Sequence, residues 1–172
     1  MYGPEKFDQN EWFAIISGLS MLILIFLLPR RLPTIVSVVV FMIGLSFSRF
    51  SDHLLGSVDP FDHYDVMDSG QFEWFDLFTY SLYGFSAYFF IYIYSWMNLK
   101  GIWAKAVYVL VWSSIGVGFE YFAVYFDFFH YIDWHYKWSF LTYLLVQPVT
   151  LILYHWVNAT HFRRAVEKES EE

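Results

Sequence analysis

The chain of 172 residues contains no cysteine, and its ten lysines and arginines are outnumbered by 17 aspartates and glutamates. The absence of cysteine excludes disulfides, thiolate catalysis and thiolate metal ligands. The net charge of −7 argues against nucleic acid as a partner, because nucleic-acid binding needs a basic surface. Apolar sequence dominates instead, since 58% of the residues are hydrophobic and 24% are aromatic.

The apolar residues form five segments, each close to the ~20 residues that cross a ~30 Å hydrocarbon layer as a helix. Only a helix satisfies its own backbone hydrogen bonds there. The sequence therefore predicts an all-α integral membrane bundle of five transmembrane helices, forming one domain over residues 1–162. Residues 163–172 are predicted to be an acidic, disordered cytoplasmic tail. The five segments are Trp12–Leu28, Leu32–Ser48, Trp74–Leu99, Ile102–Phe126 and Trp138–Val157.

The basic residues are divided unequally between the two ends of these segments. Positive residues are retained on the cytoplasmic side of short loops. Only Lys6, Arg49 and Lys137 lie on one side, so the chain is predicted to place its N-terminus outside and its C-terminus in the cytoplasm of a plasma membrane. The expected partner is the lipid bilayer, and association with itself or another membrane protein stays open. Seven basic residues lie on the predicted cytoplasmic side: Arg30, Arg31, Lys100, Lys105, Arg163, Arg164 and Lys168.

Charged residues also lie within or at the ends of the apolar segments. Insertion of a charged side chain into a membrane costs roughly 2.5–3.5 kcal/mol at the centre of a helix. Arg49 ends the second segment, Asp76 opens the third, and Glu120 lies deeper in the fourth. All three approach the outer leaflet, so we predict a polar cluster there. The candidate cluster comprises Arg49, Asp52, Asp76, Tyr80, Tyr83 and Glu120.

Small and polar residues recur at helical spacing on three of the segments. Small residues allow helices to approach closely, and hydroxyl groups can form hydrogen bonds across the contact. We therefore expect these stripes to face one another. They comprise Ser37, Gly44 and Ser48 on the second segment, Asp76, Tyr80, Tyr83, Ala87 and Tyr94 on the third, and Ser113, Gly116, Glu120 and Asp127 on the fourth.

Two interpretations of the cluster stay open. Arg49 could pair with Glu120 or Asp76 and only hold the bundle together, as in a scaffold or accessory subunit. Alternatively, Glu120 could be the centre of a polar pocket that is open to the outside and handles a cation or small solute. The sequence places transport or sensing first, a non-catalytic scaffold second and an enzyme third.

The enzyme hypothesis depends on four histidines that lie beside aspartates on the predicted outer side. A zinc hydrolase gathers three ligands around an open position, but the His-Glu-x-x-His motif is absent. Nucleophilic motifs of the Gly-x-Ser-x-Gly or Ser-x-x-Lys type are also absent. The histidines are His53, His63, His130 and His135.

Four aspartates spaced by three residues suggest a divalent cation as a further alternative. Alignment to an EF-hand loop places Met67 where an oxygen ligand belongs. We therefore expect neither a bound metal nor a cofactor. The aspartates are Asp59, Asp62, Asp65 and Asp68.

The chain resembles an uncharacterised family of small multi-pass membrane proteins, found chiefly in spore-forming Firmicutes. The resemblance is carried by single residues that are spread over most of its length. The resemblance implies a bacterial plasma-membrane protein and no particular activity. It is carried by the turn Pro29-Arg30-Arg31-Leu32-Pro33, by Asp52, Asp76 and Glu120, and by Tyr131, Trp134, Lys137, Ser139 and Tyr143.

Overall fold

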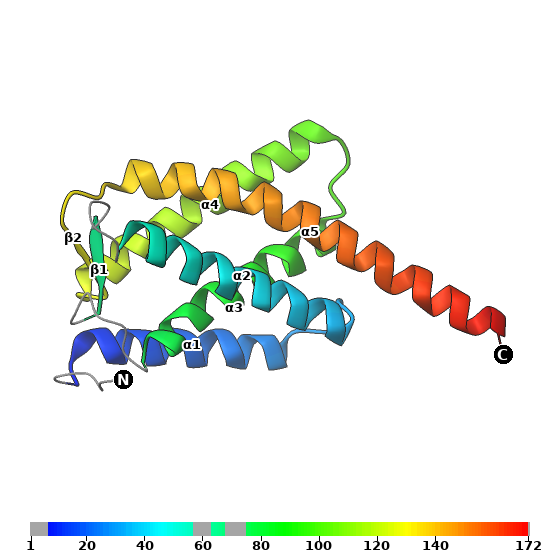
Figure 1. Ribbon diagram of the computed structural model, residues 1–172, viewed down its shortest axis with the longest axis horizontal. Coiled ribbons are helices and arrows are strands. Elements are labelled where there is room, and N and C mark those ends of the chain that lie inside the picture. The colour runs from blue at the N-terminus through cyan, green and yellow to red at the C-terminus, as the bar shows by residue number, and fades with distance from the viewer. Residues whose placement is uncertain (1–6, 57–62, 68–74, 172) are drawn as a thin grey trace.

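The computed structural model describes residues 7–56, 63–67 and 75–171, with side chains described as far as residue 163. Over these residues the chain forms five long helices and two short strands (Figure 1). The helical fold agrees with the prediction from the sequence, whereas the two strands were not predicted. The elements in chain order are α1 (Gln9–Leu27), α2 (Thr34–Leu55), β1 (Tyr64–Val66), α3 (Asp76–Met97), α4 (Ile102–Tyr125), β2 (Phe129–Tyr131) and α5 (Tyr136–Glu171).

The helix limits follow from local sequence. α1 begins with a capping box, in which the Asp8 side chain accepts from the Asn10 amide and the Glu11 carboxylate accepts from the Asp8 amide. The turn between α1 and α2 lies between two prolines, and Pro33 directly precedes the first residue of α2. α3 ends before Asn98, whose left-handed backbone (φ 46°) terminates the helix.

Four of the described helices are long and apolar enough to cross a membrane, namely α1, α2, α4 and the Tyr136–Arg163 part of α5. These properties are those of a membrane protein. α3 has the length but less apolar character, although the sequence predicts a span there. Ten of its 22 residues are buried, against three of 22 in α2, so its neighbours enclose α3 and little of it needs to face lipid.

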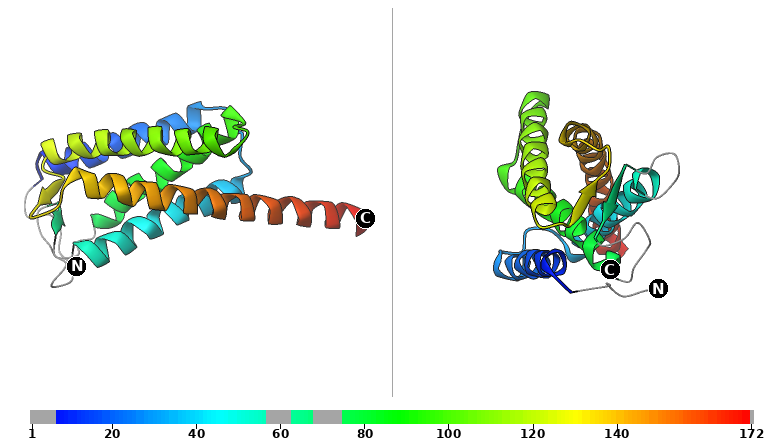
Figure 2. Two further views of the ribbon diagram at one scale, coloured as in Figure 1. Left: turned by 90° about the horizontal axis from the view of Figure 1, so that it is seen from above. Right: turned by 90° about the vertical axis from the view of Figure 1, so that its left-hand side faces the viewer.

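The packing of α2 on α3 is the most extensive helix contact among the described residues, and α3 lies between its neighbours in the end-on view (Figure 2). A Cβ atom on Gly44 of α2 would lie 2.5 Å from the backbone oxygen of Tyr83 and 2.6 Å from the Cβ of Ala87. On α3, Gly84 is similarly covered by the Phe41 ring. The small-residue stripe of the second segment therefore faces the third, as its spacing predicts.

The two strands pair antiparallel, with Tyr64 opposite Tyr131 and Val66 opposite Phe129. Additional backbone bonds join the segments, because the His63 oxygen accepts from the amides of Ile132, Asp133 and Trp134. The strands lie across one end of the bundle, which we call the strand end (Figure 1). They connect the segment after α2 to the segment after α4.

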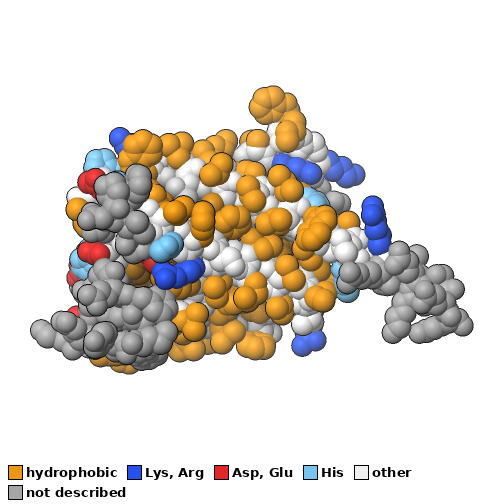
Figure 3. Space-filling view, in the orientation of Figure 1, with side chains coloured by type: hydrophobic (Ala, Val, Ile, Leu, Met, Phe, Trp, Pro, Cys, Tyr) orange, Lys and Arg blue, Asp and Glu red, His pale blue; other side chains and the backbone are white. Residues whose placement is uncertain are grey.

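Charged and apolar side chains are separated along the long axis of the molecule. The visible acidic side chains lie at the strand end, most visible basic side chains lie at the opposite end, and apolar side chains cover the surface between them (Figure 3). α5 continues beyond the bundle to Glu171, so residues 163–171 extend the helix where the sequence predicts a disordered tail (Figure 1).

Candidate functional site

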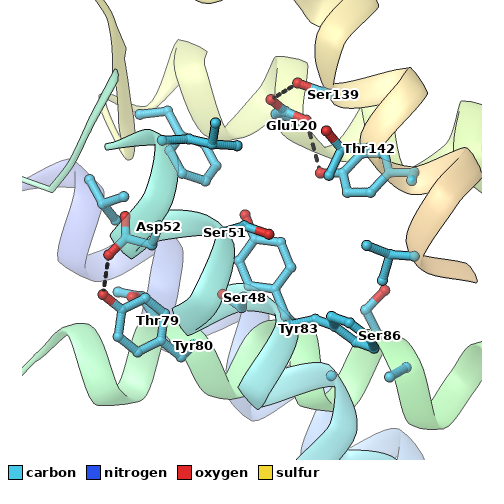
Figure 4. A pocket seen from close by; sticks show the side chains of 18 of the residues that line it. Ser48, Ser51, Asp52, Thr79, Tyr80, Tyr83, Ser86, Glu120, Ser139 and Thr142 are labelled. Carbon is cyan, nitrogen blue, oxygen red and sulfur yellow. Dashed lines mark hydrogen bonds between the residues drawn. The ribbon is translucent and has the colours of Figure 1, made fainter. Parts of the chain in front are cut away.

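A cavity of about 140 Å³ lies inside the bundle, lined by α2, α3, α4, α5 and both strands. Its lining includes Phe90 and Trp112 from the aromatic cluster at one end, and Phe128 and Phe129 from the cluster beneath the strands. The cavity therefore separates two hydrophobic cores. Acidic and hydroxyl side chains extend into it from opposite walls (Figure 4).

Asp52 occupies one wall of the cavity. Its Oδ2 atom accepts from the Tyr80 hydroxyl at 2.5 Å and from the Arg49 guanidinium at 3.1 Å. Arg49 also donates to the Tyr80 hydroxyl at 3.2 Å and lies over the Tyr80 ring, 5.5 Å from its centroid. α2 continues two turns beyond the predicted segment, and this extension places Arg49 and Asp52 on the same helical face.

Glu120, which is only 6% exposed, occupies the opposite wall. Its Oε1 atom accepts from the hydroxyls of Tyr131 and Ser139, the latter at 2.5 Å, and its Oε2 accepts from Tyr143 at 2.8 Å. The Trp134 indole donates to Ser139 at 2.8 Å and so orients that hydroxyl. Hydroxyl donors thus replace the water that a buried carboxylate loses.

Two further tyrosine hydroxyls line the cavity without a hydrogen-bond partner among the described residues. Tyr83 extends from α3 into the space between Asp52 and Glu120 (Figure 4). Tyr64 enters from β1. Burial raises the pKa of Tyr64, and the negative charges of Asp52 and Glu120 raise it further, so its hydroxyl stays protonated.

Tyr131 in β2 has the same electrostatic character. Burial raises its pKa, and the nearby Glu120 carboxylate raises it further. The hydroxyl therefore stays protonated and donates to Glu120 at any physiological pH. A strand residue thus completes a site whose acidic group lies on a helix.

The structure brings most of the predicted cluster together. Asp52, Tyr80, Tyr83 and Glu120 line the cavity, and Arg49 contacts two of these lining residues, Asp52 and Tyr80. Asp76 is buried, and its negative charge acts on the Tyr80 hydroxyl. Asp76 itself does not line the cavity.

Two contacts differ from the sequence-based expectations for the ion pair and for the stripe of the fourth segment. The scaffold interpretation paired Arg49 with Glu120 or Asp76, whereas Arg49 forms an ion pair with Asp52, and Glu120 lies across the cavity and bonds to hydroxyls. Asp127 also leaves the predicted stripe, since α4 ends at Tyr125 and the Asp127 side chain accepts from Gln9 instead. The rest of that stripe faces α5, where Ser113 donates to Gln147 at 3.1 Å.

The predicted cluster did not include Tyr64, Tyr131, Ser139 and Tyr143, which the structure places at the site. Ser139 and Tyr143 are four residues apart and so share a face of α5, a spacing that could have identified them. Tyr64 gives no such signal, because its position depends on the pairing of β1 with β2.

The histidines do not converge. His63 bonds through Nδ1 to Asp133 at 2.7 Å, whereas His135 bonds to the backbone oxygen of Trp134. Within the ranges that the structure describes, His, Asp and Glu side chains form no group of three that could hold a metal ion. Asp59, Asp62 and Asp68 of the proposed cation loop lie outside those ranges.

The arrangement provides two carboxylates, two phenolic hydroxyls without a hydrogen-bond partner among the described residues, and aromatic walls. Such a site can bind a small molecule by charge, hydrogen bonds and apolar contact. Comparisons with protein-family models, curated proteins and solved structures find nothing that matches this chain, so the function is inferred from the geometry of the site.

Proposed function

We propose that this protein is a multi-pass plasma-membrane protein that binds a small solute or ion from the outer side, for transport or sensing. The observation that carries the proposal is the cavity, in which Asp52 and Glu120 lie on opposite walls with the Tyr83 hydroxyl between them (Figure 4). Membrane proteins retain buried acidic groups mainly where they face a cavity or a pathway.

The distribution of charge supports an outward-facing site. The strand end carries the acidic side chains and the opposite end carries most of the basic ones (Figure 3). Because basic ends are retained in the cytoplasm, the strand end is the outer end in this proposal. β1 and β2 then cover the cavity on the side from which a solute arrives.

The unpaired hydroxyls favour binding over a purely structural role. A network that only joins helices would satisfy its own polar groups, since buried unpaired groups cost free energy. The hydroxyls of Tyr64 and Tyr83 have no partner among the described residues, and both contact the cavity. Water or a bound solute would supply the missing hydrogen bonds.

A scaffold remains the second candidate, because the Glu120 network also joins separate elements. Its three donors come from β2 and α5, whereas Glu120 itself is on α4. These bonds would hold α4 against α5 whether or not a solute enters.

Thiol accessibility distinguishes the two candidates. Ser48 lines the cavity, and Ser48→Cys is nearly isosteric in a chain without native cysteine. We expect this cysteine to react with iodoacetamide, a small neutral reagent, in protein reconstituted into nanodiscs. The control is Val36→Cys, on the same helix but fully buried and away from the cavity, which should stay unreactive. Equal protection of both cysteines would show a closed interior and favour the scaffold.

A further inference from the structure

The charges around the cavity leave one carboxylate without a balancing cation. Asp52 pairs with Arg49, so their charges cancel. Glu120 forms no ion pair with any described residue, and only hydroxyl groups contact its carboxylate oxygens. In surroundings of low dielectric constant, this single negative charge attracts one positive charge.

The size of the cavity limits the ligand. An apolar cavity of about 150 Å³ accommodates a benzene molecule, which has six non-hydrogen atoms. The volume of about 140 Å³ therefore admits a ligand of similar size. A metal ion needs several ligands that converge on one point, but among the described residues His, Asp and Glu side chains form no group of three that could hold one, and much of the cavity lining is aromatic.

Aromatic faces suit an organic cation. Phe90, Trp112, Phe129 and Trp134 line the cavity together with the tyrosines. A cation over the face of such a ring is attracted to it, most strongly where water is excluded. The Arg49 guanidinium over the Tyr80 ring already shows this contact beside the site. The unpaired hydroxyls of Tyr64 and Tyr83 can accept hydrogen bonds from an N–H group.

From these features we infer that the cavity binds a small organic ammonium ion of about six non-hydrogen atoms. Its ammonium group lies at Glu120 and the Tyr83 hydroxyl, and its hydrocarbon part lies against the aromatic walls. This inference rests on the proposed function and names the chemical class of the solute. Because Arg49 is paired with Asp52, the negative charge of Glu120 selects the charge of the ligand.

Protection of the Ser48→Cys protein against iodoacetamide tests the inference. Three probes of nearly equal size differ in charge: butylammonium chloride, butan-1-ol and sodium butanoate. Butylammonium at about ten times its dissociation constant should slow alkylation by about tenfold through mass action. The alcohol and the carboxylate should leave the rate unchanged.

The outcomes separate the two proposals. An unreactive Ser48→Cys protein would contradict the proposed function itself. A reactive protein that butan-1-ol or butanoate protects as well as butylammonium would leave the pocket in place and overturn the cationic class. Protection by potassium chloride alone, equal to that by butylammonium, would overturn the organic class.

Variants in the Ser48→Cys background locate the binding groups. Glu120→Gln removes the charge and should weaken protection by butylammonium about tenfold or more. Tyr83→Phe removes the unpaired hydroxyl and should weaken it by a smaller factor. The matched control is Tyr88→Phe, on the same helix but away from the cavity, which should not change protection. Unchanged protection in Glu120→Gln, with alkylation in the free protein unaltered, would contradict the inference.

Discussion

At the scale of single residues, hydroxyl groups rather than an opposite charge decide the environment of Glu120. Three donors from β2 and α5 hold its carboxylate, and the Trp134 indole positions one of them. An amide can replace a carboxylate in such a network, because each hydroxyl can either donate or accept. The removal of the whole carboxylate, in contrast, leaves three hydroxyl donors without their acceptor.

We expect Glu120→Gln to lower the free energy of unfolding by about 1–2 kcal/mol, and Glu120→Ala by about 3–5 kcal/mol. The smaller loss reflects weaker hydrogen bonds, and the larger reflects unpaired buried hydroxyls. Thermal unfolding in detergent measures both. The double variant Glu120→Gln/Arg49→Gln should be no more stable than Glu120→Gln alone, since Arg49 pairs with Asp52. Rescue by the second substitution would show that Glu120 and Arg49 are the true pair.

The two partners of the ion pair should respond unequally to substitution. The Arg49 side chain is 42% exposed and the Asp52 side chain is 15% exposed. Without Asp52, Arg49 can turn toward water. Without Arg49, Asp52 stays buried with an unbalanced charge. Arg49→Gln should therefore lower the unfolding temperature more than Asp52→Asn, and the reverse order in the same melting assay would contradict this account.

At the scale of the elements, α2 and α3 form the compact part of the bundle. Gly44 lies against the backbone of α3, and Gly84 lies under the Phe41 ring of α2. The same two helices supply Asp52, Tyr80 and Tyr83 to the cavity. A change in the distance between them would therefore alter stability and the site together.

Gly44→Ala should destabilise the protein by about 1–3 kcal/mol, because its methyl group would overlap the backbone oxygen of Tyr83. Gly118→Ala on α4 is the matched control, since a Cβ atom there meets nothing within 4 Å. The control should be neutral or stabilising by up to about 1 kcal/mol, as alanine favours a helix over glycine. Thermal melts of both variants measure the difference, and equal effects would mean that α2 and α3 are not in close contact.

At the scale of the whole molecule, the separation of charge sets the expected orientation. The strand end is acidic and the opposite end is mostly basic, with apolar surface between them (Figure 3). The exposed His130 lies in β2 at the strand end, and the exposed Lys100 lies in the turn between α3 and α4 at the other end. These positions report on the two sides of a membrane.

We expect His130→Cys to react with a membrane-impermeant maleimide in intact cells, because the acidic end is predicted to be outside. Lys100→Cys should react only after the cells are permeabilised. Since the chain has no native cysteine, each signal comes from one site. Labelling in the opposite order would reverse the orientation, and the cavity would then open toward the cytoplasm.

The helical class, the approximate helix positions and the separation of charge could all be predicted from the amino-acid sequence. These properties are local, because they depend on the composition and spacing of neighbouring residues. The turn from Pro29 to Pro33 and the contact of Gly44 with α3 follow from short motifs. The sequence also predicted a polar cluster that includes Asp52, Tyr80, Tyr83 and Glu120, because polar residues are costly in apolar segments.

Which side chains contact one another depends on the packing of distant segments. Helical periodicity defines the face of each helix but not its rotation or height relative to a distant helix, so it could not pair Glu120 with Ser139 or Asp52 with Tyr80. The pairing of β1 with β2 joins segments that lie far apart in the chain, and it alone brings Tyr64 and Tyr131 over the cavity. The shape, size and charge of the site therefore depend on long-range packing, which no local pattern specifies.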